Sequence, residues 1–417
     1  MASLGAGGVI YLTPMVFHLA SFSASQVTQG LAASALIGTT ARLLSGVLLD
    51  RGLSCSWPVR AAAVIGFIAD LTLLQADGFG GYLAGQLLIG IAAGLYFPAI
   101  ELAVPLSCTG FNSSRGYALA RSADALGVAL GALIGALVTA LGMIRSIYLV
   151  EMVALAAMLL ILSWRPLPDG RAPLLHPDSP DQTTQPRTPT TEGSSWLTPL
   201  LPVLTVSIVA TGIIALMQSA LPLDLVRGGL SRPPLSETWS GALIAWQLGL
   251  LVLLQWPIGN WVAKRSLRFG LGVGLSGFVA GCLLLAGSAL WSGGIALIAV
   301  AMVPIAFGEA AFLPTAAEAM VEETPLEHRG LAMALFSQCF AISATGAPLI
   351  AGLLLDRQGH GLLLWVLMAS ICLSMVPMLK TVRPRYTAGL SATFLKSEND
   401  VTNPRAASID QKSLDPA

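Results

Sequence analysis

The sequence predicts an all-α polytopic membrane protein, with twelve transmembrane helices in two related halves of six. Composition is the first reason, because 55% of the 417 residues are hydrophobic, only 11% are charged, and the mean hydropathy is +0.75. Soluble domains usually carry about 25% charged residues. The second reason is a series of long apolar runs. The third is a set of landmarks that recur between the two halves.

Apolar runs bounded by charged and turn-forming residues define the expected spans, since a helix needs about 20 apolar residues to cross a bilayer. The first run lacks the basic region of a signal peptide, so we interpret it as a span. It starts so close to Met1 that we expect the assigned start to be too late. In the first half the expected spans are 3–20, 30–49, 59–76, 80–103, 117–141 and 146–163. In the second half they are 198–220, 238–258, 269–291, 293–317, 330–355 and 361–379.

Two polar segments interrupt this pattern. Residues 165–196 are rich in Pro, Thr, Asp and Ser without apolar periodicity, and residues 381–417 have the same character. Such segments cannot bury a hydrophobic core, so we expect a disordered linker and a disordered tail. The expected organisation is a first half at 1–164, the linker at 165–196, a second half at 197–380 and the tail at 381–417.

The distribution of Lys and Arg predicts that both termini are cytoplasmic. With this orientation, sixteen of the 22 basic residues lie in the cytoplasmic loops, linker and tail. Four lie in the opposite loops, and Arg42 and Arg121 lie inside spans. Multi-pass proteins usually carry their excess of basic residues on the cytoplasmic side. We therefore expect an integral multi-pass protein of a cell or inner membrane, with the lipid bilayer as its partner.

Other classes of protein are disfavoured. The 22 basic and 22 acidic residues cancel and form no long basic run, so nothing indicates nucleic-acid binding. The five cysteines and four histidines are scattered, so neither a disulfide framework nor a metal site is expected. No nucleophile–base pair and no ATP-binding loop stands out, so we expect neither an enzyme nor an ATP-driven protein.

The two halves repeat one another at a nearly constant offset of 213 to 216 residues. Duplicated halves of this kind are typical of membrane transporters, which bind solute between the halves near the bilayer midplane. The matched positions are Gly46 with Gly259, Pro98 with Pro314, and Arg115-Gly116 with Arg329-Gly330.

The loop after the second span contains Gly46, Asp50, Arg51 and Gly52 and resembles the GxLxDRxG loop motif of the major facilitator superfamily. The likeness covers nearly the whole chain and implies a twelve-helix transporter that works by alternating access. It also implies that Asp50 contacts the N-terminus of the eleventh helix, where free N–H groups and the helix dipole favour a carboxylate. That helix is expected to begin near Arg329 and Gly330. The alternative is an Asp-Arg turn that only shapes the loop.

The second-half copy of this motif is incomplete. It keeps Gly259 and Lys264 but has Ala263 where the acidic residue belongs. The resemblance therefore implies that the mirrored contact is missing or weaker.

The fifth span resembles the GxxxGPxxGG antiporter motif through Gly127, Gly131 and Gly135, with Ala132 in place of the proline. Glycines four residues apart share a helix face and allow close packing, which could also seal the halves against each other. In the fourth span Gln86 stands where many proton-coupled members of the family have arginine. The resemblance is thus to the drug–proton antiporter branch, with an altered proton relay.

Glu309 is the leading candidate for proton transfer. It lies about 22 Å along the tenth span at 1.5 Å per residue, on a helix that lines the cavity in the superfamily. Ionisable residues inside spans are costly, so they are candidates for function. Loss of hydration favours the protonated carboxyl, which could then exchange a proton near neutrality. The alternative is a structural carboxylate bonded to neighbouring polar groups.

Other polar residues inside spans are weaker candidates. Arg121 and Asp124 are three residues apart on one helix face, so they form either a static pair or one that changes partners with solute or a proton. Asp70 and Glu151 lie on spans that resemble the peripheral helices of the superfamily, where structural pairing or snorkelling is expected. Glu101 falls at a cytoplasmic end. Candidates for lining a mixed aromatic and amide cavity are Tyr96, Gln218, Gln247 and Gln338.

These features predict a monomeric secondary transporter that exports a small, drug-like or amphipathic organic solute in exchange for protons. It would need no cofactor besides an ion gradient. Uptake of a metabolite by symport or facilitated diffusion is the first alternative. A non-transporting membrane sensor or assembly factor on the same scaffold is the second.

Overall fold

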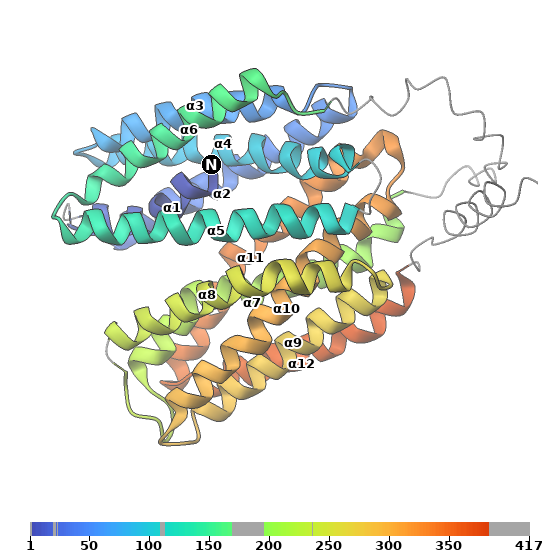
Figure 1. Ribbon diagram of the computed structural model, residues 1–417. Helices are drawn as coiled ribbons and strands as arrows, with labels where there is room; N and C mark the ends of the chain where they lie inside the picture. Colours follow the sequence, from blue (N-terminus) through green and yellow to red (C-terminus); the bar gives the residue numbers. More distant parts are fainter. Residues whose placement is uncertain are drawn as a thin grey trace, which may run out of the picture. The chain divides into compact units, whose positions relative to one another are not determined.

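The computed structural model describes residues 2–19, 22, 24–108, 113–168, 196–235 and 237–382, which form twelve α-helices, short 3₁₀ helices and no strand. The first half contains α1 (Ala2–Leu19), α2 (Ala24–Asp50), α3 (Ser56–Leu74), α4 (Phe79–Ser107), α5 (Ser113–Ala140) and α6 (Ile147–Trp164). The second half contains α7 (Leu201–Arg227), α8 (Glu237–Val262), α9 (Leu267–Ser288), α10 (Gly294–Glu323), α11 (Arg329–Gln358) and α12 (Leu362–Met375) (Figure 1). The predicted all-α fold is confirmed.

Each expected span corresponds to one helix, but several helices are longer than their apolar run. α2 begins at Ala24 rather than near residue 30, and α10 continues to Glu323 rather than ending near 317. The apolar run marks only the part of a helix that suits hydrocarbon, and a helix can continue into polar residues beyond it. Within the described chain, ten helices are long and apolar enough to cross a membrane, namely all except α1 and α8. The expected linker and tail lie largely outside the described residues.

The helix packing follows the division into halves. In the first half α1 packs against α5 and α6, and α4 packs against α2 and α3. In the second half α10 packs against α8 and α9, while α7 packs against α11. The most extensive contacts between the halves are made by two helix pairs, α2 with α11 and α5 with α8 (Figure 1). We call these pairs the α2–α11 seam and the α5–α8 seam.

The three motif glycines of α5 lie against α1. A Cβ atom at Gly131 would lie 2.1 Å from the carbonyl oxygen of Leu4, and one at Gly7 would lie 2.5 Å from that of Val128. Because no side chain fits between these backbones, glycines on both helices allow the close approach. The expected close helix contact is therefore present. Its partner is α1 of the same half, so these glycines do not form the contact between halves that the sequence also suggested.

A buried carboxylate ties α12 to α7. Asp224 Oδ1 accepts a hydrogen bond from the Gly361 N–H at 2.8 Å, and Oδ2 accepts one from Trp365 Nε1 at 3.0 Å. Arg232 Nη2 lies 3.3 Å from Asp224 Oδ1, and both side chains are 1% exposed. A buried charge is tolerated only when it is paired and hydrogen-bonded. This cluster therefore stabilises the packing of the second half.

Candidate functional site

The first part of the site is the contact between Asp50 and α11. Asp50 is the last residue of α2, and its Oδ1 and Oδ2 accept hydrogen bonds from the backbone N–H groups of Gly330 at 2.6 Å and Leu331 at 3.0 Å. These N–H groups lie in the first turn of α11, where they have no partner within the helix. The positive end of the helix dipole also favours the carboxylate. The contact expected from the sequence is thus present.

Glycines bring α2 and α11 together at this end. A Cβ atom at Gly46 would lie 2.7 Å from Ala334 Cβ and 2.9 Å from the Gly330 carbonyl oxygen. A Cβ atom at Gly330 would lie 2.6 Å from the Gly46 carbonyl oxygen. Gly52, just after α2, has a φ of 92°, which favours glycine over other residues. Gly46 of the motif and Gly330 of α11 thus allow Asp50 to lie against α11, and Gly52 of the motif turns the chain behind it.

Polar contacts continue along the α2–α11 seam. Arg42 Nε donates a hydrogen bond to Ser337 Oγ at 3.1 Å, and Gln338 Nε2 donates one to Thr39 Oγ1 at 2.8 Å. Gln338 was expected in a cavity, but its amide lies in this seam. The reason is helix orientation, because the face of α11 that carries Ser337 and Gln338 is turned toward α2. Each of these contacts joins one half to the other.

The α5–α8 seam is the symmetry-related contact, but it lacks the carboxylate. A Cβ atom at Gly259 would lie 2.5 Å from Ala118 Cβ, so the glycine allows the same close approach as Gly46. The Arg115 guanidinium lies 5.9 Å from the centre of the Trp256 ring across this seam. Ala263, the counterpart of Asp50, is buried and its methyl group cannot accept a hydrogen bond. Lys264 beside it is exposed, as is Arg51 in the first-half loop.

A cluster of charged side chains lies between α4 and α5 of the first half. Arg121 Nη2 on α5 lies 2.9 Å from Glu101 Oε1 on α4, whereas its Nη1 lies 3.9 Å from Asp124 Oδ2. The three-residue spacing had suggested that Arg121 pairs with Asp124. Its principal partner is instead Glu101. Asp124 instead accepts a hydrogen bond from the Ser3 hydroxyl of α1. An arginine within a span requires a counter-charge, and this requirement could have identified Glu101 from the sequence.

This cluster borders a cavity of about 200 Å³ between α1, α4 and α5. Tyr96 lines it, as expected, and its ring lies 5.4 Å from that of Phe97 in an edge-to-face arrangement. The Tyr117 hydroxyl donates a hydrogen bond to the Glu101 carbonyl oxygen at 2.8 Å. Polar lining residues of this cavity are Ser3, Tyr96, Glu101, Tyr117, Arg121 and Asp124.

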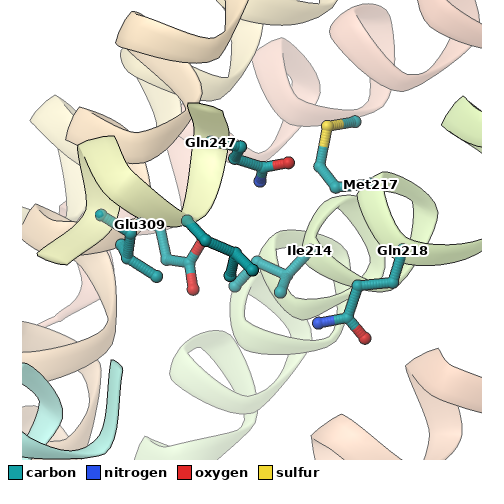
Figure 2. A pocket seen from close by; sticks show the side chains of 7 residues that line it. Ile214, Met217, Gln218, Gln247 and Glu309 are labelled. Carbon is teal, nitrogen blue, oxygen red and sulfur yellow. The ribbon is translucent and has the colours of Figure 1, made fainter. Parts of the chain in front are cut away.

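A second cavity, of about 100 Å³, lies within the second half and contains Glu309. Glu309 on α10 is 8% exposed, and Gln247 on α8 and Gln218 on α7 line the same space. Figure 2 shows Glu309 and Gln247 on one side of this space and Ile214, Met217 and Gln218 of α7 on the other. The structure thus brings Glu309, Gln218 and Gln247 together around one cavity, with an otherwise apolar lining.

The two cavities are connected electrostatically. Glu309 lies within electrostatic range of both Arg121 and Asp124, although it belongs to the other half. The Arg121 guanidinium also lies 5.5 Å from the centre of the Phe340 ring on α11, so Arg121 contacts the second half directly. Carboxyl groups of α4, α5 and α10 therefore all interact electrostatically with one guanidinium. Among the described residues, no group of three or more His, Cys, Asp and Glu side chains could hold a metal ion.

Comparisons with known proteins agree with this architecture. A family model described as Major Facilitator Superfamily matches residues 1–233 and 228–401. The chain belongs to the major facilitator superfamily. No curated protein matches this superfamily member closely. The crystal structure of the human organic anion transporter MFSD10 (TETRAN) is similar, with a TM-score of 0.66 and 17% identity over 90% of this chain and 89% of that one.

The family assignment supports an integral, multi-pass membrane transporter. At 17% identity, the likeness to the human transporter shows the shared fold alone. Members of this superfamily are transporters, which are usually not enzymes. The assignment therefore agrees with the fold and the broad class that the sequence predicted.

Proposed function

We propose that this superfamily member is a secondary active transporter that exports a small organic solute in exchange for protons. The supporting observation is the position of Glu309, which lines a cavity of the second half within electrostatic range of Arg121 and Asp124 in the first half. A carboxyl in such a water-poor site changes its interaction with nearby cations when it gains or loses a proton. Protonation of Glu309 can therefore alter how the two halves attract one another.

In the proposed cycle, Arg121 keeps its ion pair with Glu101 and gains or loses the attraction of Glu309. With Glu309 ionised, Arg121 is attracted both to Glu101, at 2.9 Å, and to the carboxylate across the interface. With Glu309 protonated, the second attraction disappears and Arg121 stays with Glu101. Solute and proton would then compete for the space around Arg121, which is the requirement for exchange. Rocking of one half against the other would expose this space to one side of the membrane at a time.

The Asp50 contact with α11 is the proposed gate of this cycle. Its bonds to Gly330 and Leu331 join the halves at one end, so opening at that end must break them. From the excess of Lys and Arg, we propose that this end faces the cytoplasm, together with both termini. The contact is then closed while the central space faces outward. The side chain of Ala263 carries no carboxylate for the α5–α8 seam, so the proposed carboxylate gate depends on Asp50.

The cavity linings favour a small amphipathic solute. Ile214, Met217 and Leu251 give the second-half cavity an apolar wall, and Tyr96 and Phe97 do the same in the first half. Polar recognition is limited to amides, hydroxyls and the charged cluster. Arg121 is the one cation among the residues that line the two cavities, and Glu101 already pairs with it. This balance favours a neutral or amphipathic solute over a strongly anionic one.

The test is proton movement in proteoliposomes that contain the purified full chain, scanned across a chemically diverse solute panel. We expect solute-dependent proton movement in the wild type and its loss in Glu309→Gln, with exchange of unlabelled for labelled solute retained. Asp356→Asn, which changes an exposed acid outside the cavities, is the matched control and should behave as the wild type. Full transport driven by a pH gradient in Glu309→Gln would overturn the proposal.

Uptake of a metabolite by symport or facilitated diffusion is the second candidate. Gln86, buried in α4 where many proton-coupled relatives have arginine, favours it. The direction of net solute flux in vesicles of known orientation separates uptake from export. Solute flux without proton movement would indicate facilitated diffusion. Stable solute binding without any flux would instead indicate a sensor or assembly factor.

A further inference from the structure

Two acidic residues lie together outside both cavities. Asp70 is on α3 and Glu151 is on α6, and their carboxyl groups are within hydrogen-bonding reach of each other. The sequence suggested a structural role for each of them. The structure pairs them with each other, so two groups of like charge share one site.

No nearby group in the described chain neutralises this pair. Asp70 is 1% exposed, and neither of its oxygens accepts a hydrogen bond from an N–H or O–H group. Arg145, which follows α5 at the same end of the first half, donates instead to the carbonyl oxygens of Leu74 at 3.2 Å and Ala76 at 3.1 Å. Its ion pair, at 3.4 Å, is with the exposed Asp77.

The phenol groups around the pair also have other partners. Tyr148 of α6, which lies within electrostatic range of Asp70, has its hydroxyl bonded to Thr13 at 3.3 Å. Tyr82 of α4, the helix on the other side of α3, donates to the Val27 carbonyl oxygen at 2.7 Å. Neither hydroxyl therefore donates to Asp70.

Two adjacent carboxylates without a cation are strongly unfavourable in a medium of low dielectric constant. A single proton between them removes one charge and makes an O–H···O⁻ hydrogen bond, which is stronger than a neutral one. We propose that Asp70 and Glu151 together bind one proton, at a site of their own outside the central cavities. This proposal does not depend on whether solute transport is coupled to protons.

The position of the pair explains how a proton can reach it and what loss of that proton would do to helix packing. Asp70 is four residues before the end of α3, about 6 Å at 1.5 Å per residue, at the end opposite Asp50. α1 passes directly over Glu151, because a Cβ atom at Gly5 would lie 2.8 Å from Glu151 Cα and 2.9 Å from its Cγ. Loss of the proton would leave two charges beneath α1. The proton therefore stabilises the packing of α1 and of α3 against α6.

The test follows thermal unfolding of the purified full chain across a series of pH values, together with infrared spectra of its carboxyl groups. In the wild type the unfolding temperature should fall as the pH rises, because the second buried charge appears on the alkaline side. Asp70→Asn and Glu151→Gln should lose the part of this fall that the pair causes, since an amide paired with one carboxylate needs no proton. Asp70→Asn should also lose an infrared band of a protonated carboxyl.

Three controls make the outcome specific. Asp77→Asn changes an exposed acid at the same end and should keep the wild-type pH profile. Glu309→Gln removes the separate contribution of the central cavity and should keep the part of the fall that depends on Asp70 and Glu151. Exchange of the two acids, by Asp70→Glu with Glu151→Asp, retains two carboxyls and should restore the profile if the single amide variants fold poorly. An identical pH profile and infrared spectrum in wild type and Asp70→Asn, or a flat profile in the exchange variant, would overturn the proposal.

Discussion

The carboxylate of Asp50 at the end of α2 accepts hydrogen bonds from the first backbone N–H groups of α11, at 2.6 Å from Gly330 N and 3.0 Å from Leu331 N. These residues are 280 positions apart in the chain and belong to different halves. The bonds combine an ionised acceptor with a helix N-terminus, so they are stronger than bonds between neutral groups. Because hydrogen bonds are short-ranged, they break when the two halves separate, as a gate between the halves requires.

Asp50→Ala should shift the chain toward the state that is open at this end. Loss of a capping carboxylate costs about 0.5–2 kcal/mol, and 1–2 kcal/mol is a factor of about 5–30 in an equilibrium. The measurement is the distance between spin labels placed at the exposed positions Arg51 and Glu327. We expect a larger population of long distances than in the wild type. Unchanged distance distributions would show that Asp50 does not hold the halves together.

Ala263→Asp should create the missing counterpart of this contact. By the internal repeat, a carboxylate at position 263 would meet the N-terminus of α5 near Gly116, as Asp50 meets α11 near Gly330. We expect the closed state to become more populated and net transport to become slower, with the double variant Asp50→Ala, Ala263→Asp close to the wild type. Faster transport in Ala263→Asp alone would contradict the symmetry argument. Ala263→Asn, which lacks the charge, is the control.

Glu101→Gln should destabilise the chain more than Asp124→Asn. Arg121 lies 2.9 Å from the nearly buried Glu101 but 3.9 Å from Asp124, whose side chain is 45% exposed. Removal of one partner of a buried pair costs about 3–5 kcal/mol, whereas an exposed pair is worth about 0–1 kcal/mol. Thermal unfolding of both variants in the same detergent measures the order. The reverse order would assign Arg121 to Asp124 instead.

Gly131→Ala and Gly346→Ala should act in opposite directions. A Cβ atom at Gly131 would lie 2.1 Å from the Leu4 carbonyl oxygen, while one at Gly346 would meet nothing within 4 Å. Overpacking costs about 1–3 kcal/mol, whereas alanine is favoured over glycine in a helix by about 1 kcal/mol. Gly131→Ala should therefore lower the unfolding temperature and Gly346→Ala should leave it unchanged or raise it. Equal tolerance of both would mean that α1 is not packed against α5 in the membrane.

Some of these relationships were visible in the sequence and others were not. The repeat of Gly46 in Gly259 and the Asp-Arg loop identified the ends of helices that meet across the halves. The spacing of Arg121 and Asp124 suggested a pair on one helix, but the stronger partner came from α4. Similarly, Gln338 was expected in a cavity and lies in the α2–α11 seam. Each error concerns the direction in which a helix face points.

The sequence by itself indicated the helical membrane class, twelve helices, the repeat between the two halves of the chain and the placement of Glu309 deep within a span. These properties depend on hydropathy and spacing along the chain, which can be evaluated without knowing which helices are neighbours in the folded protein. Only the tertiary structure decided that Arg121 pairs with Glu101, that the motif glycines of α5 face α1, and that Asp70 meets Glu151. These contacts depend on the rotation of each helix about its axis. Rotation is set by packing against segments that are distant in the chain, because lipid and protein interior are both apolar and hydropathy does not distinguish the two faces.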